Sequence, residues 1–390
     1  MPTSVGPNTK GEENLVFGYD LGDVSNSYRG EPTENLITDT AAFDSSFWNQ
    51  KSGTITANSV TGPRGIENAA KIVAVNTDPY IYSSAIVTAS TGNVTWSIWV
   101  KGVGNTVGKS AEVRINFSGT ATGTADTNAS VNLTDGWQLL QTTANVTGAG
   151  TIKFGLEAPN GAVSGDIMYF ADPMFEQKSH ATQFTAGTRS ATQGLLDLTG
   201  NSTIDLTDVS FDSSAEMTFD GSNDYVSVEY STAINTPNGA TYEIMVYPQG
   251  AGEFLTRGKS DSGTDPDNPR FYVGGNGNIY FDWSTTGADT YVDTVTGTAT
   301  LNQWNHIVGV AQPGDQLRVY VNGVQASYGT VSRTLPATLP NTSDPIIIGG
   351  ATWIPRYFTG KVGMVKLYNR NLTPTEIKEN FNGIKSRYGI

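Results

Sequence analysis

The sequence predicts an all-β protein built from antiparallel β-sandwiches, with one short helix at its C-terminal end. Charged residues make up only 15% of the 390 residues and 44 are glycine, a composition typical of many short strands joined by tight turns. Apolar and polar residues alternate in segments throughout the chain. Asx-Gly pairs, which tolerate the positive φ that hairpin turns need, occur at 135–136, 160–161, 276–277 and 322–323.

Six segments carry the clearest strand pattern. In 95–101, Trp96, Ile98 and Val100 fall on one side and Trp99 on the other. This pattern predicts half-buried antiparallel strands. The other five segments are 112–117, 152–156, 279–283, 316–321 and 363–368.

One segment near the C-terminus predicts a helix. Thr373 supplies an N-cap hydroxyl, Pro374 suits the first helical position, and Glu376 can bond back to the cap amide. Ile377, Phe381 and Ile384 then recur at helical spacing up to Gly389. We expect an amphipathic helix packed on the outside of a sheet domain.

Composition excludes several classes of protein. The chain has 37 acidic and 23 basic residues, a net charge of −14, and no basic tract, which argues against nucleic acid or an anionic membrane as partner. The absence of cysteine excludes disulfides, Cys-ligated zinc and cysteine nucleophiles. The two histidines give little material for a metal site or a catalytic dyad. His180 falls in a linker-like segment, and His306 lies in an apolar strand and is interpreted as a hydrogen-bonded structural residue.

The N-terminal segment 1–14 is polar, so we expect no cleaved secretory signal. No stretch approaches the roughly 20 apolar residues of a membrane span, so no membrane insertion is expected. Synthesis and assembly in a cytoplasm follow as the expectation.

The second half of the chain carries motifs in a fixed order. They are Met217–Val226 (MTFDGSNDYV), Trp304–Val310 (WNHIVGV), Leu317–Gly323 (LRVYVNG) and the closing segments 346–350, 358–362 and 367–373. This series resembles the laminin-G-like, concanavalin A-type jelly-roll lectin fold, and the resemblance extends from Leu195 to the C-terminus.

The beginning of that fold is displaced. Leu15–Asp20 and Ser27-Tyr28 resemble its first strand and the segment after it, but the continuation follows only at Asp197–Asn201, far along the chain. We therefore predict an N-terminal arm at 1–14, a lectin-like domain formed by 15–31 with 188–390, and a second domain, 32–187, inserted into its first loop. Exposed loops tolerate such insertions because loop-closure entropy grows slowly with length.

The insert resembles a carbohydrate-binding-module-type jelly roll of bacteriophage tail and virion proteins. The matching features are Asn35–Ile37, Trp48, Pro63–Gly65, Trp96–Lys101, Gly136-Trp137, the closing run Tyr169–Thr182 and the ending through Arg189. The ending is the most specific feature, because it commonly links such a module to the next domain in phage proteins.

Catalysis is not expected. Glycosidases need two carboxylates at a defined separation, and the Glu-x-Asp-x-x-Glu run of concanavalin A-type glucanases is absent. The isolated carboxylates Glu229, Glu243 and Asp282 are interpreted as solvated strand residues.

Structural calcium is the cofactor that the acidic loops indicate, since Ca²⁺ prefers carboxylate and carbonyl oxygens. The alternative for each loop is a turn-forming Asx residue. The candidate ligands are Asp220, Asn223 and Asp224 in one turn, the acidic loop 261–267, and Asp172 with Glu34, a pair that the module resemblance implies. The insert has 12 acidic and 8 basic residues, a net of −4, and the rest of the chain has 25 and 15, a net of −10. Most negative charge therefore belongs to the lectin-like part.

Glycan binding needs an exposed aromatic ring that stacks on a sugar, with polar groups around it. The candidates are Trp353 in the loop 351–356, Trp283 and Tyr291, with Tyr328 and Trp48 also available. The alternative for each is packing in the core, where most aromatic residues of sandwich strands lie.

Together these resemblances imply a virion structural protein of a tailed bacteriophage: a fibre, a spike, or a decoration subunit of capsid or tail. It would be made in the host cytoplasm and displayed on the virion surface. Other virion proteins and host or environmental glycans are the expected partners. A homo-oligomer is compatible with this role, although no residue pattern indicates one. The alternatives are a cellular carbohydrate-binding or adhesion protein and, less favoured, a glycan-degrading enzyme.

Overall fold

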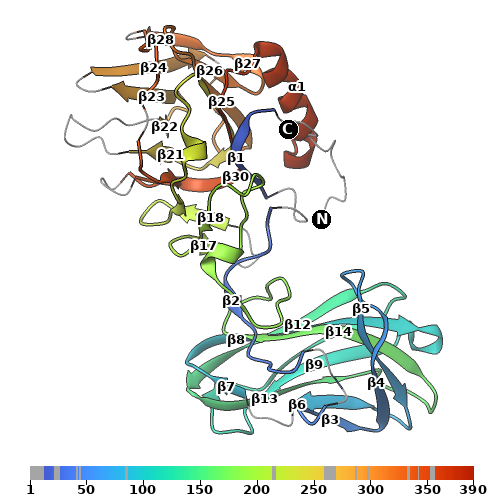
Figure 1. Cartoon of the computed structure of the whole chain (residues 1–390). Coiled ribbons are helices and arrows are strands. Elements are labelled where there is room, and N and C mark those ends of the chain that lie inside the picture. Colours follow the sequence, from blue (N-terminus) through green and yellow to red (C-terminus); the bar gives the residue numbers. More distant parts are fainter. Residues whose placement is uncertain are drawn as a thin grey trace. The chain divides into compact units, whose positions relative to one another are not determined.

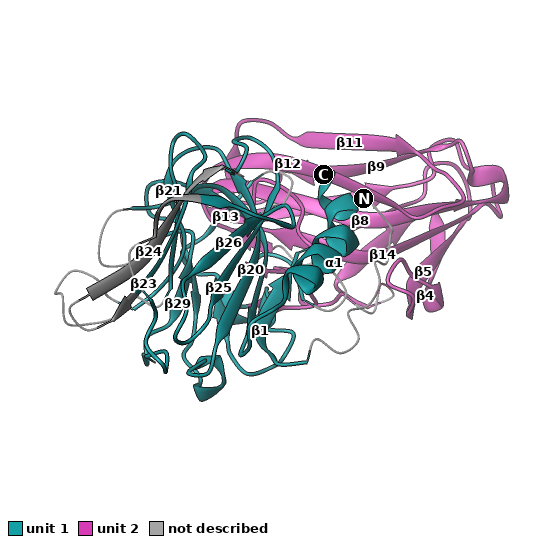
Figure 2. Cartoon of the chain, turned by 90° about the horizontal axis from the view of Figure 1, so that it is seen from above, with its two compact units in different colours: residues 1–32, 190–212, 216–390 teal, residues 33–189, 213–215 magenta. Residues whose placement is uncertain are grey.

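The computed structural model describes most of the chain and divides it into two units (Figure 2). The first unit comprises 1–32, 190–212 and 216–390, and the second comprises 33–189 with 213–215. The described residues are 13–21, 27–40, 43, 45–83, 87–212, 217–258, 269–285, 288–296, 298–331, 334–340, 342–351 and 356–390, with the backbone alone described at 284–285, 288–296 and 328–331.

The first unit contains two antiparallel sheets (Figure 1). The first sheet consists of β17 (Ser210–Phe211), β18 (Met217–Asp220), β30 (Thr359–Tyr368), β20 (Ala240–Pro248), β25 (Asn305–Ala311), β26 (Arg318–Val321) and β27 (Val324–Gln325), with β1 (Leu15–Asp20) beside β30. The second sheet consists of β16 (Ile204–Asp205), β19 (Val226–Val228), β29 (Ile346–Ile348), β21 (Gly252–Arg257), β22 (Arg270–Val273), β23 (Ile279–Thr285), β24 (Ala288–Thr296) and β28 (Ser327–Val331).

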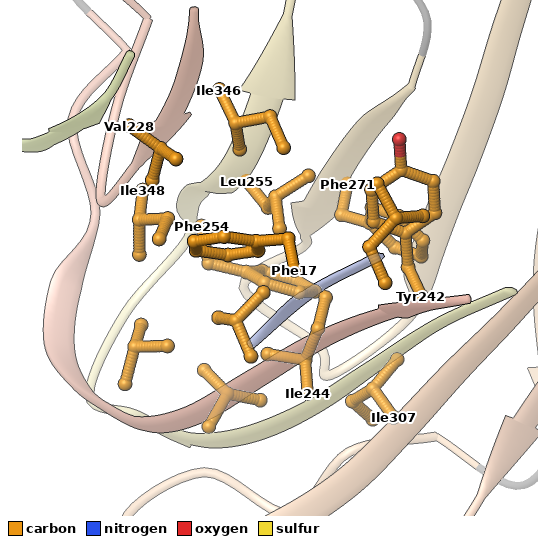
Figure 3. Packing of buried hydrophobic residues seen from close by; sticks show 14 of the residues in the cluster. Phe17, Val228, Tyr242, Ile244, Phe254, Leu255, Phe271, Ile307, Ile346 and Ile348 are labelled. Carbon is orange, nitrogen blue, oxygen red and sulfur yellow. The ribbon is translucent and has the colours of Figure 1, made fainter. Parts of the chain in front are cut away.

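The core of the first unit is formed by apolar residues from both sheets. Figure 3 shows Phe17 and Ile244 of the first sheet together with Phe254 and Phe271 of the second. These four side chains are fully buried. Period-2 alternation explains this arrangement, because it places every second residue of each strand on the face that the other sheet covers.

The second unit also contains two antiparallel sheets over a separate apolar core. One sheet consists of β10 (Thr122–Gly123), β12 (Gln138–Gly148), β8 (Gly92–Val103), β14 (Ile167–Glu176), β5 (Glu67–Ala74) and β4 (Gly53–Thr61). The other consists of β11 (Thr127–Asn132), β9 (Ser110–Asn116), β13 (Gly150–Glu157), β6 (Tyr80–Ser83) and β3 (Trp48–Lys51), with β7 (Val87–Ala89) beside β13. As the alternation predicts, Trp96, Ile98 and Val100 are buried.

The two ends of the second unit are joined to each other. β2 (Thr33–Glu34) pairs antiparallel with β15 (Thr188–Arg189). The Asn35 side chain adds hydrogen bonds of 2.9 Å to the carbonyl groups of Pro173 and Thr185. The two ends of the segment 33–189 are therefore adjacent in space although they are far apart in the sequence. Its ends lie beside the predicted insertion boundaries, 32 and 187.

The all-β fold class is confirmed, and each of the six predicted segments overlaps a strand. The predicted hairpin at 322–323 connects β26 to β27, with positive φ at Asn322 (51°) and Gly323 (74°). A Cβ at Gly323 would lie 3.2 Å from the side-chain Cδ of Lys378 and 3.1 Å from Phe381. Glycine at this turn therefore permits both the backbone conformation and a close approach to the C-terminal helix.

The predicted C-terminal helix is confirmed as α1 (Pro374–Ile384), which lies beside β27 (Figure 1). The Thr373 hydroxyl accepts from the Glu376 amide, and the Glu376 carboxylate accepts from the Thr373 amide at 2.7 Å. Ile377, Phe381 and Ile384 are buried. The short 3-10 turns are η1 (Gly104–Thr106), η2 (Ala191–Gln193), η3 (Thr232–Ile234) and η4 (Lys385–Tyr388).

A buried polar cluster lies between α1 and the first sheet. Glu243 of β20, 1% exposed, bonds His306 Nε2 through Oε1 at 2.8 Å. Its Oε2 accepts from Tyr368 at 3.0 Å and from Asn380 of α1 at 3.1 Å. His306 is therefore the structural residue that the sequence predicts, whereas the interpretation of Glu243 as a solvated residue is wrong because α1 covers it.

The cluster keeps Glu243 ionised. Burial alone would raise the pKa of this carboxyl, but the hydrogen bond and charge of His306, the charge of Lys366 and the Tyr368 hydroxyl together lower the pKa to about 2. A carboxyl whose pKa is lower in the folded state stabilises the fold above its ordinary pKa of 4.5, and that contribution disappears as the pH falls toward 2.

We therefore expect the free energy of unfolding to fall as the pH drops from about 4.5 to 2, by on the order of 2 kcal/mol from Glu243 alone. Glu243→Gln is expected to be less stable at pH 7 and to have a flatter profile over this range, as measured by urea unfolding. Glu229→Gln, which alters an exposed carboxylate directly after β19, serves as the control. An equally steep decline in Glu243→Gln would contradict this assignment.

Candidate functional site

The face of the second sheet that points away from the core carries polar and aromatic side chains. In β22, Phe271 and Val273 are buried, whereas Arg270 and Tyr272 alternate with them and are half-buried. In β23, Phe281 is likewise buried, whereas its neighbour Tyr280 is half-buried and points to the opposite face. The strand register places Arg270 opposite Asp282 and Tyr272 opposite Tyr280. Residues directly opposite each other share one face of a sheet.

Arg270, Tyr272 and Tyr280 line a pocket of about 600 Å³. Tyr272 and Tyr280 pack edge to face, with ring centroids 5.4 Å apart. The lining residues are Gly221, Ala251, Gly252, Arg270, Tyr272, Tyr280, Arg356 and Tyr357. The pocket is thus lined by three aromatic rings, two guanidinium groups and glycine backbone.

The two arginines of the pocket pair with buried carboxylates. Arg270 Nε donates to Asp282 at 2.7 Å, and its Nη1 lies 3.9 Å from Glu253 Oε1. Arg356 Nη1 lies 3.4 Å from the same Glu253 oxygen. The Glu253 side chain is fully buried, whereas the Arg356 side chain is 54% exposed. Among the described lining residues there are two arginines and no carboxylate.

The turn predicted as a metal site adjoins this pocket through Gly221. Asp224 is buried, and its carboxylate accepts from Ser210 Oγ and from the Asp220 amide, each at 2.9 Å. Asp220 Oδ1 accepts from the Ser222 amide at 2.7 Å. Burial raises the pKa of Asp224. These bonds are those of the turn-forming alternative, and Asn223 is an exposed member of the same turn.

The second predicted calcium pair has a different arrangement from the one expected. Asp172 accepts two hydrogen bonds from Arg64, at 2.8 and 2.9 Å, and one from Asn68 at 2.7 Å. Arg64 also stacks on Phe184, 4.5 Å from the ring centroid. Glu34 is exposed on β2, with no contact to Asp172 in the described part of the chain. The guanidinium supplies the positive charge that calcium was expected to provide.

No group of three His, Asp or Glu side chains that could hold a metal ion occurs within the ranges described above. The acidic loop 261–267 lies outside the described residues, so its role as a calcium site stays a prediction. Calcium at the Asp220–Asp224 turn likewise stays a prediction.

The predicted aromatic candidates have different outcomes. Trp283 is 1% exposed and packs beside Tyr242 and Phe281, so the prediction that it stacks on a glycan is wrong. It lies on the inner face of β23, one residue away from the outward-facing Asp282. Trp48 is also a core residue.

The other aromatic candidates fall at the limits of the described residues. Trp353 lies outside them. The backbone of Tyr291 in β24 lies opposite Asp282, next to the pocket strands, but its side chain and that of Tyr328 are outside the described part. Arg356 and Tyr357 follow directly after the loop that contains Trp353.

The three isolated carboxylates named from the sequence, Glu229, Glu243 and Asp282, lie in different environments. Glu243 has a pKa lowered to about 2 and is buried under α1. Asp282 is ion-paired with Arg270 and is mostly buried, not solvated as expected. Glu229 is exposed, as predicted.

Five pocket residues were not predicted from the sequence: Arg270, Tyr272, Tyr280, Arg356 and Tyr357. A signal for three of them was present. The segment 279–283 alternates, and the Gly274–Gly277 run is a hairpin turn, so the strand before the turn must carry its polar residues on the same face. Arg356 and Tyr357 come from a distant loop, and only the fold brings them there.

Comparison with known proteins agrees with this architecture. Residues 220–378 match the model of the concanavalin A-like lectin/glucanases superfamily. The lining residues of the pocket all lie within this matched range, and the sandwich that carries them has a concanavalin A-like fold. No curated protein matches the sequence.

Several solved structures are similar over part of the chain. Domain 4 of AbnA, an extracellular GH43 arabinanase from Geobacillus stearothermophilus solved with arabinotriose, has 18% identity and a TM-score of 0.32, covering 42% of this chain and 74% of that one. The receptor-binding domain of botulinum neurotoxin D has 10% identity, a TM-score of 0.37, and coverages of 50% and 51%. The binding domain of Paraclostridial Mosquitocidal Protein 1 has 16% identity, a TM-score of 0.39, and coverages of 48% and 49%. The chain spans about half the length of these toxin domains.

None of the helices within the described ranges has the length and apolar character needed to cross a membrane.

The arginine contact of Asp172 is testable. Asp172→Asn removes the charge that Arg64 and Asn68 bind, so we expect a loss of about 1–3 kcal/mol in the free energy of unfolding, measured by denaturant titration. EDTA is expected to act equally on the melting temperatures of the wild type and the variant, because arginine is the counter-charge of Asp172. If EDTA lowers the melting temperature of the wild type but not that of the variant, calcium binds at Asp172 and this assignment is contradicted.

Proposed function

We propose that this protein is a carbohydrate-binding adhesin displayed on the virion of a tailed bacteriophage, as a fibre, spike or decoration subunit. The observation that carries the binding activity is the pocket of about 600 Å³ lined by Tyr272, Tyr280, Tyr357, Arg270 and Arg356. It lies on the concanavalin A-like domain matched over 220–378.

The chemistry of the pocket suits a saccharide. A sugar ring has an apolar face of C–H groups, which packs on tyrosine rings, and a rim of hydroxyls, which accept from guanidinium groups and donate to backbone carbonyls. Gly221 and Gly252 leave backbone close to the pocket surface. The pocket volume falls within the range typical of small-ligand sites.

The same residues support binding without hydrolysis. Glycoside hydrolysis needs one protonated and one ionised carboxyl group at the scissile bond. Here Asp282 and Glu253 pair with arginines, which compete for the carboxylate oxygens. Neither carboxylate lines the described part of the pocket.

The virion assignment is supported by the sequence resemblance of the insert 32–187 to phage modules. In this proposal the first unit binds the glycan, the second unit extends the displayed surface, and the segment 1–14 docks onto capsid or tail proteins. Calcium would have a structural role in the acidic loops of the first unit.

Glycan binding is tested by removing one ring. Tyr280→Ala is expected to weaken binding of a recognised glycan about tenfold, because a stacked aromatic contributes on the order of 1 kcal/mol or more. A glycan array identifies the ligand, and calorimetry measures affinity. Tyr230→Ala, which removes an exposed tyrosine of the same unit outside the pocket, is the control. No binding by the wild type, or equal losses in both variants, would contradict the proposal.

The location is tested separately. The protein is expected in purified particles in stoichiometric amount, detected by mass spectrometry after density-gradient banding. Its absence from particles, together with its presence on a cell surface, would instead favour the cellular adhesin.

A further inference from the structure

We infer that the pocket of the first unit takes an acidic sugar, whose carboxylate binds Arg356 and Arg270 while its ring packs on the tyrosines. This inference rests on the proposed function and specifies the class of glycan. The first observation behind it is that the charged side chains lining the pocket are positive.

The positive groups line the pocket, whereas the two carboxylates beside them on the same face of the sheet are buried. Arg270 and Arg356 are lining residues, whereas Glu253 is fully buried and Asp282 is mostly buried. The nearest described charge that a ligand meets is therefore a guanidinium. This arrangement is unusual for a chain with a net charge of −14.

The two arginines differ in how they are held. Arg270 donates through Nε at 2.7 Å and through Nη2 to the same Asp282 oxygen, so its guanidinium is fixed in orientation. Arg356 contacts Glu253 through one nitrogen at 3.4 Å. Strong guanidinium–carboxylate bonds measure about 2.7–2.9 Å and are often bidentate. A guanidinium has five N–H donors, so Arg356 retains donors for a ligand carboxylate.

The tyrosines add selectivity for a sugar over a simple anion. Tyr272 and Tyr280 stand edge to face at 5.4 Å, and Tyr357 comes from the segment after β29, beside Gly350. An inorganic anion would use the arginines alone. A uronate or sialate uses both the arginines and the rings, because its carboxylate is attached directly to a sugar ring.

The net charge of the protein limits the length of the ligand. A polyanion such as a nucleic acid places many charges along a negative surface, and repulsion acts over a Debye length of about 8 Å at physiological salt. A saccharide with one carboxylate is attracted by the two arginines and carries no further charges for the negative surface to repel. An acidic monosaccharide unit at the end of a glycan, or isolated within one, is the class that fits.

The test compares matched sugars on the full chain by calorimetry. The probes are methyl β-D-glucuronide against methyl β-D-glucoside, sialyllactose against lactose, and inorganic phosphate as the sugar-free anion. We expect the carboxylated member of at least one pair to bind about tenfold more tightly than its neutral partner, with the preference reduced at high salt.

Arg356→Gln is expected to abolish this preference, because it weakens binding of the acidic sugar more than binding of its neutral partner. Arg318→Gln removes one positive charge from β26 of the first sheet, where Arg318 pairs with Asp315 and does not line the pocket. It is expected to retain the preference. Melting temperatures of both variants check that the fold is intact, and Arg356→Lys distinguishes the planar bidentate contact from charge alone.

The outcomes separate this inference from the function it rests on. Equal affinity for acidic and neutral sugars, with Tyr280→Ala still lowering both, would leave glycan binding standing and overturn the acidic preference. A preference that survives Arg356→Gln would also overturn it. Phosphate binding without binding of any of the sugars would show a general anion site and would overturn both the inference and the glycan-binding function.

Discussion

The pairing of β1 with β30 is the constraint on which the first unit depends. β1 spans Leu15–Asp20 and β30 spans Thr359–Tyr368, so this antiparallel pair joins segments from opposite ends of the chain. Phe17 and Tyr19 of β1 are fully buried in the core between the sheets. At the end of β1, Asp20 pairs with Arg387 at 2.7 Å and accepts from Tyr388 at 3.2 Å, so the same strand also holds the chain after α1.

The packing of the core determines which side chains face the pocket, because successive residues of a strand point to opposite faces of the sheet. Once Phe271 and Phe281 are fixed against the first sheet, Arg270, Tyr272, Tyr280 and Asp282 must face the opposite way. Stability and recognition are therefore encoded at alternate positions of the same two strands. A change on the inner face alters packing, whereas a change on the outer face alters the pocket and leaves the core in place.

Strand positions and the C-terminal helix could be predicted from the sequence because their signals are local. The Thr373–Glu376 cap and the alternation of 95–101 each lie within a few residues. Alternation divides a strand into two faces, but it does not show which of the two faces is covered by another element and becomes buried. For this reason the sequence does not show that Trp283 faces the core. It also does not show that α1, which is distant in sequence, covers Glu243.

The site residues were harder to predict because their partners are distant in sequence. Asp172 meets an arginine 108 positions away, and the pocket combines Gly221, the strands at 270–280 and the segment 356–357. No local pattern specifies such contacts, since each side chain alone is also compatible with a turn or a solvated surface. Residue types near loops indicated the correct region, while the fold determined which of them converge.

The paired ends of the second unit have a consequence for how such a protein can change. Thr33–Glu34 and Thr188–Arg189 hydrogen-bond to each other, and Asn35 ties the entering segment to the leaving one. Because the chain enters and leaves this inserted domain at one place, the domain can be replaced as a single unit. Recombination at its two ends, which are distant in sequence but adjacent in space, could exchange the whole domain for another module, while β1 and β30 still pair and close the host domain.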